Sequence, residues 1–451
     1  MNSLTKHPAG SVRELWTVAW PMILSSASGC LMLFGDRLVL SFYSQEAFNA
    51  NVGAMPWYWA FIFAFQKIIG IAQVFVGQFN GEKNFRQIGS VVWQMIWLSL
   101  ALWIFFIPFA PLGTPYLLAK NLEVLGVPYL QILFLFLPIQ YASYGALASF
   151  FTGCGKTKVV FLVTLFANAL NILLDIWFVF GGWFIPSMGI RGAAWATGLS
   201  QVASFLILFL LFYRKSHHQK YGVFYKKIDR ALLLRCVKTG LPNGIGALLN
   251  CVGWAWLLQV LALHVSMEEF TAFGIAFSVY SVCFFMIEGV GISVGSVCAN
   301  AIGSKQYWII GKNLRSAAML LLCFNLITLY TMVISPQTLI HLFLPVNSSG
   351  VIAQLAGNML FWAWLMFVVE GFWFSLQSML TAAGDTKFTM TVNVSTFWLV
   401  ACLPVYIILC FNPQQGALRL WQAVVCEQAV RVIFMYWRYR QKKWQRIHLT
   451  A

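Results

Sequence analysis

Five polar residues within otherwise apolar stretches are the first candidates for chemistry. Asn168, Asn171 and Asp175 are spaced i, i+3 and i+7, which places their side chains on one face of a helix. Asp36 lies in an earlier apolar stretch and Thr197 in a later one. A hard cation such as Na⁺ prefers oxygen ligands of these kinds, and two carboxylates that lie close together can instead share a proton. These residues therefore predict a site for a small cation or a proton.

The elements that must position these residues follow from the composition. Of 451 residues, 60% are hydrophobic and 9% are charged, whereas a soluble domain carries about 25% charged residues. A membrane span needs roughly 20 apolar residues. We expect twelve spans, at about residues 15–42, 52–78, 88–110, 126–150, 159–182, 189–213, 239–264, 271–301, 313–335, 352–380, 388–411 and 417–437. The fold class is therefore an all-α polytopic membrane protein, neither a soluble enzyme nor a β-barrel with alternating strands.

The loops between the expected spans differ in charge. With the N-terminus inside, 24 of the 29 Lys and Arg fall in inner segments, and six of these, beginning with Arg431, belong to the C-terminal tail. The positive-inside rule then places both termini in the cytoplasm of a cell (inner) membrane protein. Topology thus accounts for the net charge of +16, and we expect no nucleic acid. The basic aromatic tail is typical of a lipid-headgroup anchor.

The two halves of the sequence repeat motifs in the same order. Each pair is separated by 221 to 229 residues: Pro21 and Pro242, Gly53 and Gly274, Gly81 with Lys83 and Gly89 against Gly303 with Lys305 and Gly311, and Thr152–Lys158 against Thr381–Lys387. A long polar stretch separates the first six spans from the last six. We expect an N-terminal lobe at 1–213, a cytoplasmic linker at 214–238 and a C-terminal lobe at 239–451, related by a parallel repeat.

The helix geometry brings the polar residues to one depth. Asp175 lies about 17 residues beyond Lys158, or roughly 25 Å along its helix, and Asp36 is also on an outward-running helix. A carboxylate at the bilayer centre costs about 2.5–3.5 kcal/mol, so each acid needs a partner, a wet cavity or a proton. Structural alternatives stay open. Asp36 could pair with Arg37, Asn171 could join helices, and Thr197 could bond its own backbone.

The segment from Asn168 to Asp175, followed by Gly181-Gly182 and then Gly189–Thr197, resembles the fifth and sixth helices of multidrug and toxic compound extrusion (MATE) transporters. Family-like features elsewhere are Trp20-Pro21, Gln78–Lys83, and Gly155–Lys158 with Gly384–Lys387. The resemblance covers about residues 14 to 435. It implies two six-helix lobes forming a V, and export of small organic, usually cationic compounds by antiport with Na⁺ or H⁺. The expected partners are such a substrate, the coupling cation and the lipid bilayer, and we expect a monomer.

The C-terminal half carries secondary candidates for the ion site. Glu288 lies on the expected eighth helix and Glu370 on the tenth. In NorM-type members of the family an acidic residue on the tenth helix serves coupling, and Glu370 falls at the matching position. Those members also have a glutamate eight residues after the seventh-helix proline, where this chain has Asn250. This departure favours the N-terminal lobe as the location of the ion site. Instead of serving coupling, Glu370 could simply be an acid that is satisfied where it packs against tryptophans.

Two further expectations concern mechanism and function class. Pro21 removes a backbone hydrogen bond, so the first helix can bend there. A flippase for a lipid-linked precursor of the same superfamily is the alternative function. It would need additional helices and a cavity lined by several Arg or Lys, whereas the expected helices contain only Arg37 and Lys67. No ion-channel filter, Walker A motif or paired histidine spacing occurs, so we expect neither catalytic residues nor a metal or cofactor.

Overall fold

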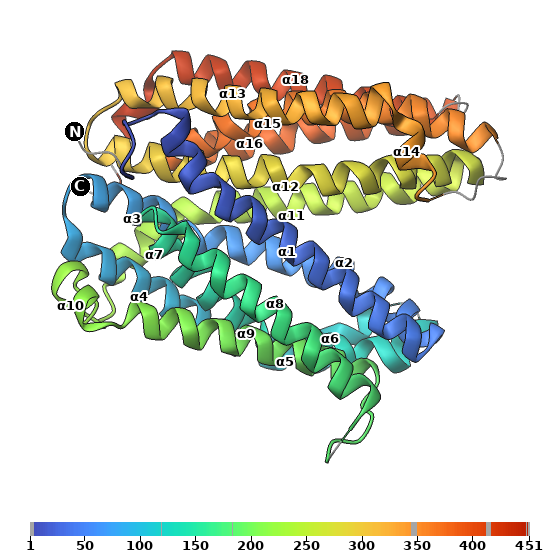
Figure 1. The fold of residues 1–451 in the computed structure, drawn as a ribbon, viewed down its shortest axis with the longest axis horizontal. Coiled ribbons are helices and arrows are strands. Elements are labelled where there is room, and N and C mark those ends of the chain that lie inside the picture. The colour runs from blue at the N-terminus through green and yellow to red at the C-terminus, as the bar shows by residue number, and fades with distance from the viewer. Residues whose placement is uncertain are drawn as a thin grey trace.

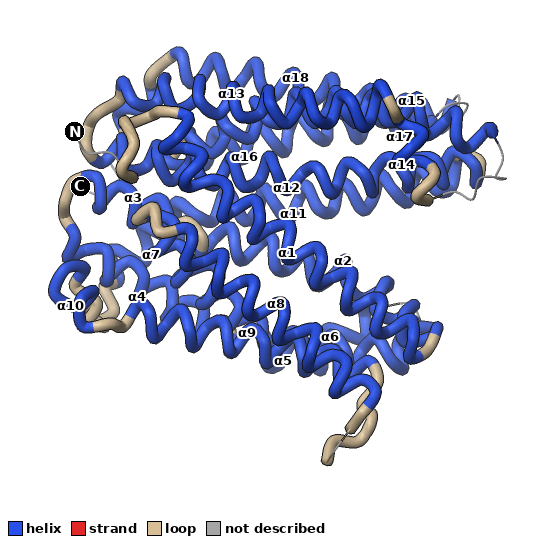
Figure 2. Tube along the Cα trace, in the orientation of Figure 1, coloured by secondary structure: helices blue, strands red, loops and turns tan. Residues whose placement is uncertain are grey.

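The computed structural model describes residues 4–118, 120–182, 184–343, 350–411, 416–447 and 449. The outermost residues of the expected lobes, 1–3 and 450–451, lie outside this range. Nearly all of the described chain is helical (Figure 2). The all-α polytopic fold expected from the composition is confirmed.

The helices follow the expected order. The first six spans are α1 (Val12–Tyr43), α2 with α3 (Gln45–Ile69 and Ala72–Gly81), α4 with α5 (Phe85–Ala101 and Trp103–Gly113), α6 with α7 (Glu123–Gln140 and Ala148–Gly153), α8 (Thr157–Phe180) and α9 (Ile190–Phe212). After the short α10 (Lys215–Tyr221), the last six are α11 (Arg230–His264), α12 (Met267–Gly303), α13 (Trp308–Leu329), α15 (Gly350–Ala382), α16 with α17 (Thr386–Thr396 and Leu403–Phe411) and α18 (Gly416–Arg440), and α14 (Pro336–Ile340) follows α13.

Eleven spans within the described residues are long and apolar enough to cross a membrane. The twelfth helix, α18, is not among them because it contains several charged residues, but it packs along α15 within the bundle (Figure 1). Several helices extend beyond the expected apolar spans. Helix α11 begins at Arg230, ahead of the span expected from residue 239, because the Asp229 side chain caps the helix by accepting from the backbone N–H groups of Ala231 and Leu232.

The helices form two bundles, which we call the N-terminal lobe (α1–α9) and the C-terminal lobe (α11–α18). In Figure 1 the lobes converge at the end that carries both chain termini and diverge toward the other end. We call the converging end the termini end. The first turns of α1 and α11 cross between the lobes there: Leu15 and Ala19 pack into the core of the C-terminal lobe, whereas Leu232 and Cys236 pack into that of the N-terminal lobe.

The repeats around Gly81 and Gly303 lie at the termini end, where each lobe touches the other. A Cβ on Gly81 would overlap the carbonyl oxygen of Asn300, and a Cβ on Gly303 would overlap that of Gln78. Two cross-lobe hydrogen bonds are related in the same way. Gln78 Nε2 donates to the carbonyl of Ala382 at 2.7 Å, and Asn300 Nδ2 donates to that of Gly153 at 2.8 Å.

Two pairs of repeated residues form turns. Lys83 and Lys305 have positive φ angles of 62° and 57°, and Gly155 and Gly384 have φ angles of 73° and 86°. Each of these residues follows the end of a helix, where the left-handed conformation closes the last turn. These repeats therefore mark the same turns in both lobes.

Candidate functional site

Two buried acids meet between α1 and α8. Asp36 is 2% exposed and Asp175 is 0% exposed, and α1 packs closely along α8. Their carboxyl groups lie within hydrogen-bonding reach of each other. Since ionised carboxylates only accept, this contact is a hydrogen bond when one proton lies between them. Neither oxygen of Asp175 has a donor among the described residues. The pair is therefore suited to hold a proton or a small cation.

Asn171 connects this pair to α9. With its amide oriented to satisfy both neighbours, Asn171 donates to Asp36 Oδ1 at 2.9 Å and accepts from the Thr197 backbone N–H at 3.3 Å. The opposite orientation would turn the amide oxygen toward the carboxylate, which cannot donate. The structure thus brings Asp36, Asn171, Asp175 and Thr197 together from three helices. We call these four residues the acidic-pair site.

Asn168 has a separate contact one turn away on α8. Its amide donates to Ser28 Oγ of α1 at 2.9 Å, so it holds the same two helices together without reaching the acids. Pro21 is buried within α1, seven residues before Ser28. Arg37 is exposed and forms no ion pair with Asp36 within the described chain. The pairing of Asp36 with Arg37 considered from the sequence is therefore not present.

A polar shell surrounds the acidic-pair site. Tyr129 lies within electrostatic reach of both acids and accepts from Asn51 Nδ2 at 2.9 Å. Gln201 Nε2 donates to the hydroxyl of Tyr58 and to Gln140 Oε1, both at 3.0 Å. Sequence reasoning missed these residues. A usable signal existed for Gln201, which lies four residues after Thr197 and so on the same helical face.

The C-terminal lobe contains a second buried polar group. Glu370 on α15 is 5% exposed and accepts from the hydroxyl of Tyr280 on α12. It also interacts electrostatically with Glu427 and Arg431 of α18. Glu288, by contrast, is half-buried and lies near Cys30 of α1. The structure therefore places only one of the two C-terminal candidates among other buried charges.

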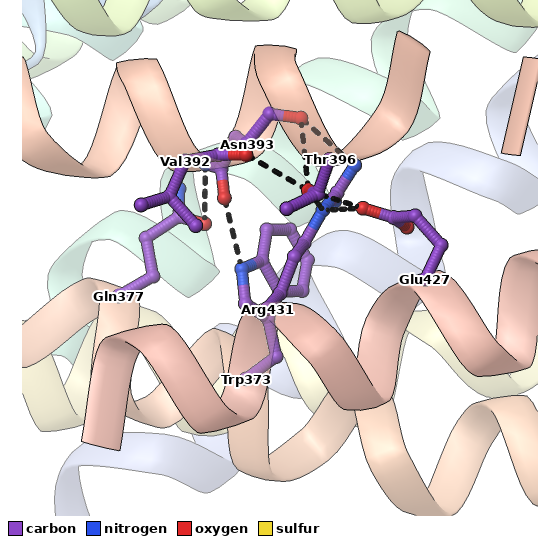
Figure 3. A network of polar contacts seen from close by, with 7 residues as sticks. All are labelled: Trp373, Gln377, Val392, Asn393, Thr396, Glu427 and Arg431. Atoms are coloured by element: carbon purple, nitrogen blue, oxygen red, sulfur yellow. Dashed lines mark hydrogen bonds and ion pairs between the residues drawn. The ribbon is translucent and has the colours of Figure 1, made fainter. Parts of the chain in front are cut away.

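Arg431 corrects the charge count made from the sequence. That count assigned it to the cytoplasmic tail, but it is 4% exposed within α18 and forms an ion pair with Glu427, which is fully buried (Figure 3). The physical reason is the i, i+4 spacing, which lets the carboxylate neutralise the guanidinium inside the bundle. Arg438, one of the half-buried residues nearer the chain end, pairs with Asp385 at 2.6 Å.

Comparison with known proteins identifies the family. The MatE family model matches residues 21–177 and again residues 245–407, which is well over half of the chain. The chain belongs to the MATE family. The two matches fall one in each lobe, as a parallel repeat requires. MATE proteins are multidrug transporters and not enzymes, so this chain is a multi-pass membrane transporter of small organic compounds.

Relatives and solved structures agree with this assignment. The chain is 23% identical to "Probable multidrug resistance protein YoeA" of Bacillus subtilis, over 95% of this chain and 93% of that one. It is 22% identical to "Probable multidrug resistance protein NorM" of Thermotoga maritima, over 99% and 96%. Among solved structures, "Crystal structure of MATE in the straight conformation" superposes with a TM-score of 0.84 at 18% identity, covering 97% of both chains. A second, "Outward-facing conformation of a multidrug resistance MATE family transporter of the MOP superfamily", has a TM-score of 0.81 at 19% identity, covering 96% and 97%.

The C-terminal lobe differs from NorM-type members of the family at one position. Asn250, which stands where NorM-type sequences have a glutamate, is half-buried, and its Oδ1 accepts no hydrogen bond from the described residues. Within the described chain no group of three or more His, Cys, Asp or Glu is placed to hold a metal ion.

Proposed function

We propose that this MATE transporter exports small organic, cationic compounds by antiport with H⁺ or Na⁺, and that the acidic-pair site carries the coupling ion. The observation that supports this most is the contact between Asp36 and Asp175 on two packed helices, with Asn171 bridging to α9. Two charged carboxylates in contact repel each other strongly in an apolar interior. A proton or cation between them turns this repulsion into attraction.

Ion binding at this site has a path to the lobe interface through α1. The first turns of α1 pack in the core of the C-terminal lobe, whereas Asp36 belongs to the N-terminal lobe. Pro21 lies between these two regions, and Gly289 of α12 packs against Ile23 just beyond it. When the acids lose their ion, α1 is pushed away from α8, and the bend at Pro21 allows this without unfolding the helix. An ion that binds with different affinity to the straight and the bent arrangement of α1 shifts the populations of the two.

The proposal includes topology and boundaries. The lobes comprise residues 1–213 and 239–451, the linker comprises 214–238, and both termini face the cytoplasm of the cell membrane. The V would then open outward, and the protein would work as a monomer. The flippase alternative receives no support from the buried charges. The one buried arginine of the described spans, Arg431, is already paired with Glu427, so it is not free to hold a pyrophosphate.

Transport in proteoliposomes tests the coupling. Efflux of a fluorescent organic cation is recorded under a Na⁺ gradient alone and under a pH gradient alone. We expect one gradient to drive export in the parent, and Asp175→Asn or Asp36→Asn to abolish it at equal abundance. Glu46→Gln, an equally isosteric change at an exposed acid, is the control and should transport normally. Export that depends on neither gradient contradicts antiport, and full activity of both Asp variants contradicts the site.

Equilibrium binding tests more directly whether the coupling ion and the substrate compete. If ion and substrate favour opposite arrangements, raising outside Na⁺ or H⁺ weakens substrate binding by the parent. Asp36→Asn should bind substrate with an affinity that no longer responds to either ion. The measurement is substrate affinity in detergent across a range of pH and Na⁺ concentrations. An equal response in both proteins would remove Asp36 from the mechanism and leave Glu370 as the next candidate.

A further inference from the structure

The buried arginine of the C-terminal lobe lies in a cage of oxygens and rings. Its guanidinium pairs with Glu427, donates through Nε to Thr396 Oγ1 at 3.2 Å, and donates through an Nη to the carbonyl of Asn393 at 3.2 Å. The Arg431 guanidinium carbon also lies 4.9 Å from the ring centre of Trp373. Figure 3 shows these groups converging on the guanidinium from α15, α16 and α18. Each contact is one that a bound cation would make.

The cage is itself held in place. Thr396 donates to Glu427 Oε1 at 2.6 Å, and Trp373 Nε1 donates to Asn393 Oδ1 at 3.1 Å. Asn393 in turn donates to Gln377 Oε1 at 3.0 Å. A side chain that only neutralised Glu427 would not need this second layer of oriented groups. The arrangement matches the way proteins orient the ligands of a bound ion.

The charge balance points to a role beyond packing. Glu370, Glu427 and Arg431 together carry one excess negative charge when all three are ionised. Glu370 is bonded to Tyr280, and the second oxygen of Glu427, Oε2, is buried without a donor in the described chain. Three of the oxygens that could bind a Na⁺ ion, however, are already in contact with the guanidinium: Glu427 Oε1, Thr396 Oγ1 and the carbonyl oxygen of Asn393. The group can therefore take up a proton, whereas a metal cation finds no free cage.

We propose that Arg431 is a built-in cation of the C-terminal lobe, which occupies a cation site and thereby excludes Na⁺ from Glu370 and Glu427. The coupling ion of each transport cycle then binds only at the acidic-pair site. This deepens the proposed antiport and rests on it for its consequence in transport. The cage itself is a binding property, so it can be measured without any transport assay.

Na⁺ binding in a background that lacks the other site is the first test. Asp36→Asn with Asp175→Asn removes the acidic pair, and thermal unfolding is then followed with Na⁺ as the only probe, against Cs⁺ at equal ionic strength. A ligand that binds the folded state raises the melting temperature saturably. We expect no response while Arg431 is present, a saturable rise after Arg431→Gln, and loss of that rise when Glu427→Gln is added.

Each other outcome overturns the inference. A saturable Na⁺ response with Arg431 intact means that the guanidinium does not exclude Na⁺. No response in a folded Arg431→Gln variant means that the cage is a structural ion pair only. Transport results do not enter these comparisons, so failure of the cage and failure of the antiport remain distinguishable.

Chemical rescue keeps the inference testable if Arg431→Gln folds poorly. In Arg431→Ala, free guanidinium ion at low millimolar concentration should raise the melting temperature and the yield of folded protein. Arg438→Ala, which breaks the ion pair with Asp385 at the edge of the bundle, is the matched control and should not respond. Equal rescue of both variants, or of neither, contradicts a cation cage at Arg431.

Discussion

The cross-lobe hydrogen bonds at the termini end should hold this side of the transporter closed. Gln78 and Asn300 each donate to a backbone carbonyl of the opposite lobe, at 2.7 Å and 2.8 Å. Asn300 also accepts from Asn80 Nδ2 at 2.6 Å. Gln78 and Asn300 are related by the internal repeat, because they are 222 positions apart. Gln78→Ala with Asn300→Ala removes all three contacts while leaving every helix intact.

The size of the effect follows from the bonds removed. A net hydrogen bond contributes about 0.5–1.5 kcal/mol, so three contribute roughly 1.5–4.5 kcal/mol to the closed arrangement. When the lobes part, water forms hydrogen bonds with the groups that become exposed. The free-energy difference between parent and variant therefore arises in the closed state. A midpoint of about 3 kcal/mol corresponds to about a 150-fold change in the ratio of closed to open molecules. Gln78→Ala alone should give roughly one third of this free energy.

Distances between the lobes measure this ratio. Spin labels are placed on genetically encoded amino acids at Gln219 of α10, which packs against α4 of the N-terminal lobe, and at Lys387 of the C-terminal lobe. Both positions are exposed, and these labels avoid the ten native cysteines. Pulsed electron spin resonance in nanodiscs should show a longer distance that gains population in the double variant. Asn313→Ala is the control, because Asn313 is buried and bonds only within its own lobe, to Val294 and Cys298. Unchanged distances in the double variant, or an equal change in the control, would refute the reasoning.

Three further predictions use other parts of the structure. Gly303→Ala should force the lobes apart and lower transport, whereas Gly274→Ala, where a Cβ meets nothing within 4 Å, should transport normally in the same liposome assay. Asn171→Ala removes the amide beside Asp36 and should raise the ion concentration for half-maximal transport by about tenfold. Burial, with the nearby Lys156 ammonium, lowers the pKa of His217. The neutral ring therefore stabilises the fold above about pH 6.5, and this stability is lost as the pH falls toward the lowered pKa. His217→Gln should flatten the fall in melting temperature between neutral and mildly acidic pH.

The parts of the fold that could be predicted are those that depend on local sequence. Apolar runs gave the twelve helices because a span needs a fixed length of apolar residues. The 1.5 Å rise per residue placed Asp36 and Asp175 at one depth, and the two side chains do meet. The internal repeats indicated two related lobes before any contact between them was known. Whether the acids carry the coupling ion stays a prediction.

The parts that could not be predicted depend on contacts between distant segments. Tyr280 reaches Glu370 across 90 positions, and helical periodicity carries no information about such a pair. Arg431 was misplaced because a basic residue near the C-terminus usually marks the cytoplasmic side. Only Glu427, four residues earlier, signals that the charge can be buried. A rule that pairs oppositely charged residues on a helix before counting loop charges would have found it.

The two lobes keep a common scaffold but not a common arrangement of charge. By the 221-residue offset of the two prolines, Asp36 corresponds to Leu257, which is fully buried. By the 229-residue offset of the turn motifs, Glu370 corresponds to Tyr141, which donates to the carbonyl of Phe61. An isolated acid in the membrane costs several kcal/mol. Each lobe must therefore compensate the charge of its own buried acids. The N-terminal lobe pairs two acids that need an ion from outside, whereas the C-terminal lobe supplies its cation from Arg431. On the two proposals made above, an ion that binds and leaves in each cycle has room only in the first arrangement, and we therefore expect the N-terminal lobe to couple transport to the ion gradient.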